Sequence, residues 1–102
     1  MGLEITLENE EGTKIESVVD PHRLLLALIR EANDSTSCCL RFIDPYGDTV
    51  FNRPQMDQLQ VELDGLRHFA KNADQLELLE QVENLAKRCQ QKPHFYVKIY
   101  GD

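Results

Sequence analysis

Residues 41–55 read RFIDPYGDTVFNRPQ, a stretch in which turn-forming residues separate two short apolar runs. Asp44 suits the first position of a turn, because its carboxylate can accept a hydrogen bond from the backbone two residues further on. Pro45 presets φ at the next position, and Gly47 supplies the left-handed residue of a turn that is followed by a bulge. The stretch therefore predicts a tight hairpin between two antiparallel strands.

Strands are predicted where apolar and polar residues alternate between turn signals. The alternation is clearest near the two ends of the chain, in LEITLE and in FYVKIY. A polar turn, NEEG at 9–12, follows the first strand and predicts a second hairpin. The predicted strands cover residues 3–8, 15–19, 38–43, 49–51 and 95–100.

The first helix is predicted from its start signal and its apolar content. Asp20 followed by Pro21 suits a helix start, because aspartate accepts hydrogen bonds from the unpaired backbone N–H groups and proline fits the first turn. The segment HRLLLALIREA at 22–32 then has apolar residues on nearly every side. This composition predicts a mostly buried helix.

Two further helices are predicted from apolar stripes with spacings of three and four. The second opens at NRP (52–54), and Gly65 in its interior marks a close packing point. The third opens at one of two pairs with capping-box spacing, Asn72 with Gln75 or Asp74 with Glu77. The stripes are Met56, Leu59, Leu63, Leu66 and Ala70 in the second helix, and Leu76, Leu79, Val82, Ala86 and Cys89 in the third.

The predicted order of elements is ββαββααβ, in a single α+β domain over residues 1–102. Because consecutive strands joined by short turns pair antiparallel, we expect an antiparallel sheet of about five strands. The three helices are expected to pack mainly on one face of that sheet. A chain of 102 residues is long enough for one domain with a hydrophobic core of its own.

The chain carries 18 acidic and 11 basic residues, which give a net charge of −7. This balance disfavours direct binding to nucleic acid, since phosphate binding depends on clustered lysine and arginine, and it favours basic protein partners. The longest apolar run, LLLALI at 24–29, is too short to span a bilayer. Three cysteines without an apolar leader are typical of a reducing compartment, so we expect a cytoplasmic protein that does not bind membranes.

The residues that could support catalysis or bind metal do not form a recognisable pattern. Asp44 and Asp48 lack the D-x-D-x-D-G rhythm of a calcium loop. Cys89 and His94 lack a second pair of zinc ligands, and no histidine lies near a cysteine in a pattern typical of a thiol nucleophile. We therefore expect a protein that is not an enzyme and uses no metal or cofactor, with a small ligand-binding domain as an alternative.

The predicted partner-binding residues lie at the two hairpin tips. The turn does not require Tyr46, and exposed aromatic residues often anchor a partner. Acidic side chains flank it and also occupy the first hairpin tip. The predicted partner-binding residues are Asp44, Tyr46, Asp48, Glu10 and Glu11. Our leading hypothesis is a non-enzymatic acidic interaction domain that inhibits a basic toxin or nuclease by mimicking phosphate.

The last strand supports an alternative hypothesis, a homo-oligomer. Tyr96 and Tyr100 share one face of that strand. If the strand lies at the edge of the sheet, its unpaired backbone groups can bind the same strand of a second copy. On this hypothesis the chain forms a homodimer.

Two segments resemble a group of small, largely uncharacterised bacterial proteins. The segment LRFIDPYGDTVFN at 40–52 is similar to the core that this group shares, and HFYVKIYGD at 94–102 is similar to its aromatic last strand, which ends in YGD. The resemblance implies a small α+β protein of the bacterial cytoplasm and implies no catalytic residue. Small acidic proteins of this kind also include immunity proteins that accompany secreted toxins.

Overall fold

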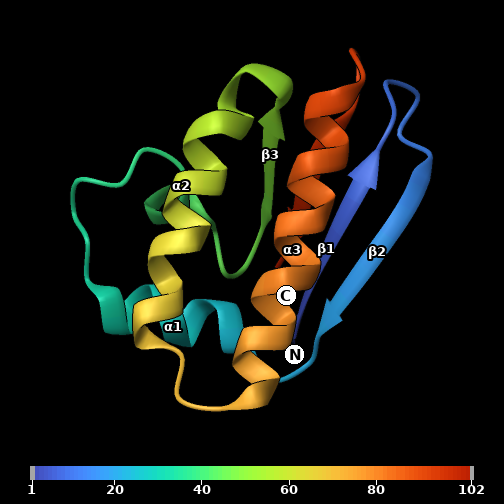
Figure 1. Ribbon diagram of the computed structural model, residues 1–102. Helices are drawn as coiled ribbons and strands as arrows, with labels where there is room; N and C mark the ends of the chain where they lie inside the picture. Colours follow the sequence, from blue (N-terminus) through green and yellow to red (C-terminus); the bar gives the residue numbers. More distant parts are fainter. Residues whose placement is uncertain (1, 102) are drawn as a thin grey trace.

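The structure, a computed structural model, describes residues 2–101. They form two layers, a four-stranded antiparallel sheet and three helices that cover one of its faces (Figure 1). The strands are β1 (Leu3–Glu8), β2 (Lys14–Asp20), β3 (Asp48–Asn52) and β4 (Tyr96–Tyr100). The helices are α1 (Leu24–Ala32), α2 (Met56–Leu66) and α3 (Ala73–Gln91). The predicted α+β class and the three helices are confirmed.

The C-terminal strand lies in the middle of the sheet. The strand order is β2-β1-β4-β3, with every neighbouring pair antiparallel, so β2 and β3 are the edges. The two ladders of β4 place Leu7, Val97 and Phe51 in one row across three strands. The edge position that the homodimer hypothesis required of β4 is not observed, because both sides of this strand are already paired.

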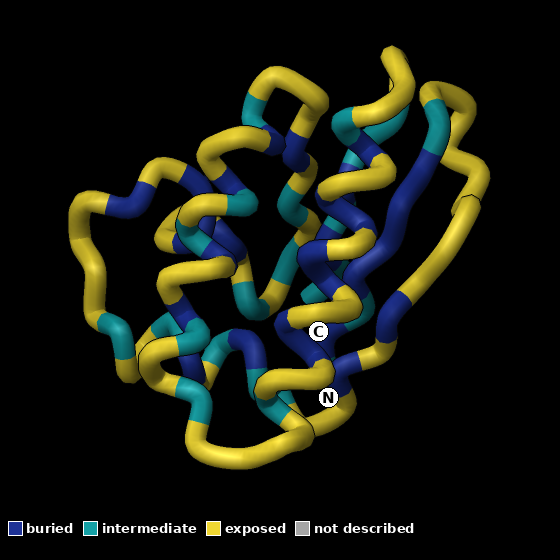
Figure 2. The backbone as a smooth tube through the Cα atoms, viewed as in Figure 1, coloured by how far each residue is buried: buried dark blue, intermediate teal, exposed yellow. Residues whose placement is uncertain are grey.

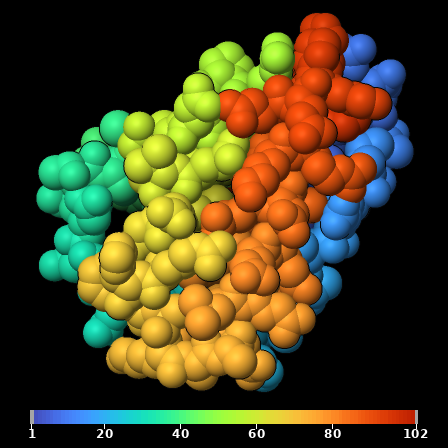
Figure 3. Space-filling model, viewed as in Figure 1, coloured from blue at the N-terminus to red at the C-terminus, as the bar shows by residue number. Residues whose placement is uncertain are grey.

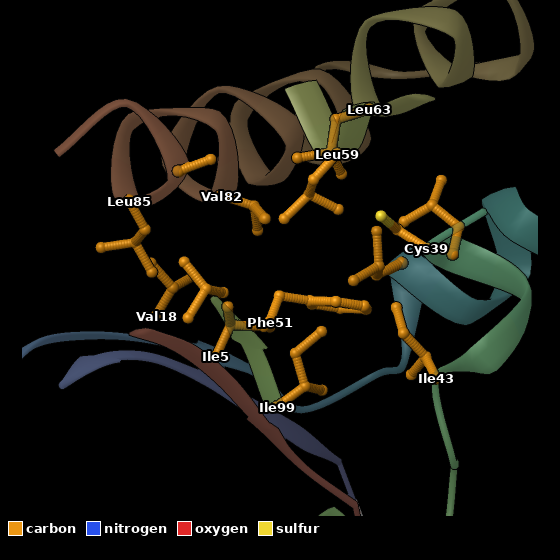
Figure 4. Close-up of a cluster of buried hydrophobic side chains, with 14 of the residues drawn as sticks. Ile5, Val18, Cys39, Ile43, Phe51, Leu59, Leu63, Val82, Leu85 and Ile99 are labelled. Carbon is orange, nitrogen blue, oxygen red and sulfur yellow. The ribbon is translucent and has the colours of Figure 1, made fainter. Parts of the chain in front are cut away.

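The hydrophobic core fills the space between the sheet and the helices (Figures 2 and 4). Alternate strand residues face it, and in Figure 4 Val82 and Leu85 of α3 lie across from Ile5 and Val18 of the sheet. The predicted stripes are confirmed except at two positions. Leu76 is 40% exposed, and Ala70 lies beyond the end of α2. The stripe residues that are buried are Met56, Leu59, Leu63, Leu66, Leu79, Val82, Ala86 and Cys89.

The capping prediction for α3 is confirmed for one of its two alternatives. The side chain of Asn72 accepts a hydrogen bond from the N–H of Gln75 at 2.9 Å, and the side chain of Gln75 accepts one from the N–H of Lys71 at 2.6 Å. These bonds satisfy backbone donors that a helix start leaves unpaired. Helix α3 therefore begins at Ala73, directly after this cap.

Residues 38–43 do not form the strand that their apolar content predicts. They contain a single 3₁₀ turn, Leu40–Phe42, and the N–H groups of residues 38–40 are bound by the side chain of Glu62 in α2. Backbone donors that are already bound cannot pair with a neighbouring strand. The sheet therefore has four strands instead of about five, and β3 pairs with β4.

Helix α1 is less buried than its apolar sequence predicts. Two of its residues, Leu25 and Leu28, are buried. The helix crosses one end of the helical layer, below α2 in Figure 1, so only one of its sides faces the core. The predicted role of Asp20 is confirmed, because its buried carboxylate accepts hydrogen bonds from the N–H groups of Leu24 and Leu25 at 2.9 and 3.0 Å. The predicted start at residue 22 is wrong, because α1 begins at Leu24, after a left-handed Arg23 with a φ of 55°, so Pro21 lies before the helix and not in its first turn.

The turn with a left-handed glycine occurs in the first hairpin instead of the DPYGD loop (residues 44–48). Gly12 has a φ of 82°, and its N–H donates to the carbonyl of Asn9 at 3.0 Å. Gly47 does not have a positive φ. A Cβ atom at Gly47 would lie 2.6 Å from a carboxylate oxygen of Asp44, so a larger residue there would require the Asp44 side chain to shift.

Gly101 is packed tightly against the DPYGD loop. Its N–H donates to the carbonyl of Gly47 at 2.7 Å, and an added Cβ would lie 2.6 Å from the carbonyl carbon and oxygen of Pro45. Because backbone would have to shift, we expect Gly101→Ala to lower the free energy of unfolding, measured in urea, by about 1–3 kcal/mol. Asp102, which ends the YGD segment, lies outside the described residues.

The same substitution at Gly65 provides a matched control. A Cβ at Gly65 would meet no atom within 4 Å, so this glycine is not the close packing point that the sequence predicts. Because the residue lies inside α2, Gly65→Ala is expected to raise the free energy of unfolding by about 0.5–1 kcal/mol. Similar effects of the two substitutions would contradict the close packing of Gly101.

Candidate functional site

The predicted partner-binding residues lie at opposite ends of the sheet. Asp48 pairs with Tyr100 at one end of the ladder, whereas Glu8, which precedes the first hairpin turn, pairs with Tyr96 at the other. Figure 1 shows the turn between β1 and β2 at the top and the chain entering β3 from below. The structure therefore brings Asp44, Tyr46 and Asp48 together in one loop and places Glu10 and Glu11 away from them.

Within the DPYGD loop, the two aspartates have internal contacts and Tyr46 projects outward. The Asp44 carboxylate accepts a hydrogen bond from the N–H of Tyr46 at 2.9 Å, as the sequence predicts for a turn. The Asp48 carboxylate lies 3.9 Å from the ammonium group of Lys98. Tyr46 is 75% exposed, and the guanidinium group of Arg23 lies 5.4 Å from its ring centroid.

A groove of about 390 Å³ runs beside Tyr46, between α1 and residues 40–46, and is open to solvent on one side. We call it the arginine groove, because half of the six arginines in the chain line it. Its charged and aromatic lining residues are His22, Arg23, Arg30, Arg41 and Tyr46. Its apolar and small lining residues are Leu26, Ala27, Ile29, Leu40, Ile43 and Pro45.

Two arginines of the groove are held in place by contacts to the surrounding loops. Arg23 donates a hydrogen bond to the carbonyl of Pro45 at 3.3 Å. Arg41 donates to the carbonyl of Ser35 at 3.0 Å, and its guanidinium group lies 4.6 Å from the ring centroid of Phe42, which is 60% exposed. The described lining residues include no acidic side chain, although the chain as a whole has a net charge of −7.

The sequence contains only part of the signal for this groove. Arg23 and Arg30 are seven residues apart, a spacing that places them on one side of the helix predicted over residues 22–32, although Arg23 precedes α1 in the structure and has a φ of 55°. Arg41 comes from a different segment, and its approach to α1 depends on the loop that replaces the predicted strand. The three arginines were therefore not predicted as site residues from the sequence, whereas Tyr46 at the edge of the groove was.

A second cavity, of about 380 Å³, lies between α2 and the loop of residues 33–39. Figure 3 shows this loop on the outside of the molecule, with a hollow between it and α2. Glu62 lies at this junction, and its carboxylate accepts hydrogen bonds from the N–H groups of Cys38, Cys39 and Leu40 at 2.7, 3.1 and 3.0 Å. The carboxylate thus fastens the loop to α2.

The ionised form of Glu62 is the form that this arrangement favours. Partial burial by itself raises the pKa of the carboxyl group, but the hydrogen bonds from the backbone and from the side chain of Gln58 outweigh burial. The pKa of Glu62 therefore lies below its ordinary value. The carboxylate is saturated by donors of its own chain, which favours a structural role.

The sheet face turned away from the helices carries a polar network around Tyr100. The Tyr100 hydroxyl donates to the carboxylate of Glu8, and Thr6 donates to the same oxygen at 2.6 Å. Glu8 is 5% exposed and Thr6 is fully buried, even though no helix covers this face. The ammonium groups of Lys14 and Lys98 lie 4.8 and 4.6 Å from the centroid of the tyrosine ring.

The negative charge of Glu8 is stabilised by hydrogen bonds and lysines within the network. Burial by itself raises the pKa of Glu8, but the hydrogen bonds from Thr6 and Tyr100 and the nearby lysines lower it below its ordinary value. The hydrogen bond to Glu8 in turn raises the pKa of the Tyr100 hydroxyl. The Tyr100 hydroxyl therefore has a partner within the chain, the carboxylate of Glu8, and their hydrogen bond stabilises the uncovered face of the sheet.

The buried thiols are poorly suited to nucleophilic chemistry. Burial raises the pKa of Cys39 and of Cys89 to about 11, so both thiols are protonated at neutral pH. Within residues 2–101, no group of three His, Cys, Asp or Glu side chains is arranged to hold a metal ion.

Comparison with known proteins assigns no family, because no protein-family model, no curated protein and no solved structure matches this chain. In the part of the chain that the structure describes, none of the helices has the length and apolar character needed to cross a membrane. The arginine groove and Tyr46 are therefore interpreted from their own geometry.

Proposed function

We propose that the protein is a non-enzymatic interaction domain that binds a partner protein at the surface formed by Phe42, Tyr46 and the arginine groove. The observation that carries this proposal is the exposure of two aromatic side chains beside arginines. Tyr46 is 75% exposed and Phe42 is 60% exposed, and each ring has a guanidinium group over it. Tyrosine and arginine are enriched among the residues that contribute most to protein–protein binding.

The loop that carries Tyr46 is already ordered by internal contacts, which supports the proposal. Besides its bond to Tyr46, Asp44 donates its own N–H to the hydroxyl of Thr49 at 2.9 Å. Gly101 binds the same loop from the end of β4. An ordered loop loses little conformational entropy on binding, so more of the contact energy contributes to affinity.

The charge of the groove favours an acidic partner surface at this site. Arg30 of α1 and Arg41 of the segment 40–46 both line the groove, and clustered guanidinium groups attract carboxylates and phosphates. A basic partner that binds the acidic tip at Glu10 and Glu11 stays a prediction from the sequence. The two hypotheses place the partner at opposite ends of the molecule, which makes them separable by substitution.

Substitution of the two exposed aromatic residues tests the proposal. The double variant Phe42→Ala/Tyr46→Ala is expected to capture a specific partner from a lysate of the source cells at least about tenfold less well than the wild type, because hot-spot truncations cost 2 kcal/mol or more. Quantitative mass spectrometry of proteins captured on the immobilised chain measures this loss. The captured protein is then purified and its affinity measured by calorimetry.

Two control variants make the result specific. Val61 on α2 is 67% exposed, so Val61→Ala removes an exposed apolar side chain away from the site and should leave capture unchanged. Glu10→Lys/Glu11→Lys reverses the charge of the other tip. Capture that survives the aromatic double variant and is lost with the Glu10/Glu11 variant would overturn the proposed surface and support the basic partner.

A further inference from the structure

The arginine groove has the chemistry of a binding site for an acidic peptide. We infer that it binds an extended segment of the partner in which carboxylate or phosphate groups alternate with apolar side chains. This inference rests on the proposed interaction function and adds the chemical class of the segment that is bound. It is carried by Arg30 of α1 and Arg41 of the segment 40–46, which line the same groove together with apolar side chains.

The positive charges that line the groove favour a negatively charged ligand. Arg30 and Arg41 line it, and its described lining residues include no carboxylate. Two acidic residues adjoin the lining residues in sequence. Asp44 directs its carboxylate to the N–H of Tyr46 within the loop, and the carboxylate of Glu31, which follows Arg30, lies 3.7 Å from the ammonium group of Lys71. Arginine binds carboxylate and phosphate through two parallel N–H groups, so Arg30 and Arg41 can each hold one anionic group of the segment.

The apolar lining of the groove favours an apolar side chain next to the anion. Leu26 and Ile29 of α1 line it together with Leu40 and Ile43 of the other segment. A peptide with alternating acidic and apolar residues can place successive side chains on these two kinds of surface, because alternate side chains of an extended chain point to opposite sides. The groove is open along one side, which suits a peptide better than a small molecule that needs to be enclosed.

Fluorescence anisotropy with three labelled peptides tests the inference on the full chain. The probes are a peptide of alternating leucine and glutamate, the same peptide with glutamine in place of glutamate, and a version with phosphoserine in place of glutamate. We expect the anionic peptides to bind and the glutamine peptide to bind at least about tenfold more weakly. Binding should weaken when the salt concentration rises from roughly 0.05 M to roughly 0.5 M, since exposed charges are then screened.

Charge-matched variants locate the site. Arg30→Glu is expected to weaken binding of the anionic peptides about tenfold or more, whereas Lys87→Glu, an equal charge change on α3 outside the groove, should change it less than about twofold. Arg30→Gln, which removes the charge and keeps the residue polar, should give an intermediate loss. Thermal unfolding of each variant confirms that the fold is retained.

Each outcome has a defined meaning. Binding of the glutamate peptide, the phosphoserine peptide or both, with a selective loss in Arg30→Glu, supports the inference and identifies the anion. Equal loss in Arg30→Glu and Lys87→Glu, equal binding of the glutamine peptide, or no binding of any peptide overturns it. The peptide assay does not depend on the natural partner, so the inference can fail while Phe42→Ala/Tyr46→Ala still loses its partner, and the reverse.

Discussion

Phe51→Ala is expected to lower the free energy of unfolding by about 3–5 kcal/mol, a large part of the stability of a domain of this size. Phe51 is 3% exposed and is the one buried residue of the edge strand β3. In its row it is paired with Val97 of β4, so the ring joins β3 to the apolar surface beneath the helices. Figure 4 shows the ring extended into the core.

The cost of this substitution has two parts. Removal of the ring loses the free energy of burying it, and the cavity left behind cannot fully close because helices and sheet are held by many other contacts. The remaining side chains of β3 are exposed or partly exposed, so none of them replaces Phe51 as an anchor. Urea unfolding followed by circular dichroism gives the free-energy difference.

The neighbouring residue supplies the control. Val50 is 53% exposed and lies on the opposite face of β3, because successive side chains of a strand point to opposite faces. Val50→Ala should therefore change the free energy of unfolding by less than about 0.5 kcal/mol. A loss below about 1 kcal/mol for Phe51→Ala would contradict the placement of this ring in the core.

The elements that sequence analysis predicted correctly are those with a strong local period. LEITLE and YVKIY alternate in a single phase, and the side chains at Leu3, Ile5, Val97 and Ile99 are buried as that phase requires. The stripes of α2 and α3 likewise follow the helical period over many residues. Local pattern is sufficient for such segments, since one face of each is fully buried in the core.

The elements that sequence analysis missed depend on partners that are distant in sequence. Residues 38–43 are apolar enough for a strand, but Glu62, more than twenty residues away, binds their N–H groups. The middle position of β4 is equally non-local, because its two neighbours are β1, at the start of the chain, and β3, which follows the DPYGD loop. This loop does not join two paired strands, so the hairpin predicted there is wrong. No pattern within a short window contains this information.

In the candidate site, too, the feature set by local sequence was predicted and the feature set by distant residues was not. Tyr46 was predicted from the turn alone, since the turn chemistry leaves its side chain without a structural task, and the structure places it at 75% exposure. The positive charge beside it was not predicted, because the net charge of −7 conceals a local group of arginines. Overall charge describes the average surface, whereas a binding site depends on which charges the fold brings together.

Glu62→Ala is expected to lower the free energy of unfolding at neutral pH by about 2–3 kcal/mol, because three backbone N–H groups lose a charged acceptor at once. Water replaces part of this interaction, since the site is only partly buried. Amide hydrogen exchange should accelerate at Cys38, Cys39 and Leu40, the donors of these bonds. The exposed Glu80 of α3 is the control, and Glu80→Ala should cost less than about 0.5 kcal/mol.

The contribution of Glu62 to the free energy of unfolding should decrease as the pH falls. The pKa of Glu62 is lower in the folded protein than the ordinary value of 4.5, so the ionised carboxylate stabilises the fold at pH values above that ordinary value. This contribution is lost as the pH falls through the lowered pKa, because the carboxyl group is then protonated in both states. The stability difference between the wild type and Glu62→Gln should therefore be greatest near neutral pH and shrink in acid. A difference that stays constant from neutral pH down to acid would show that packing, and not the ionised carboxylate, fastens the loop to α2.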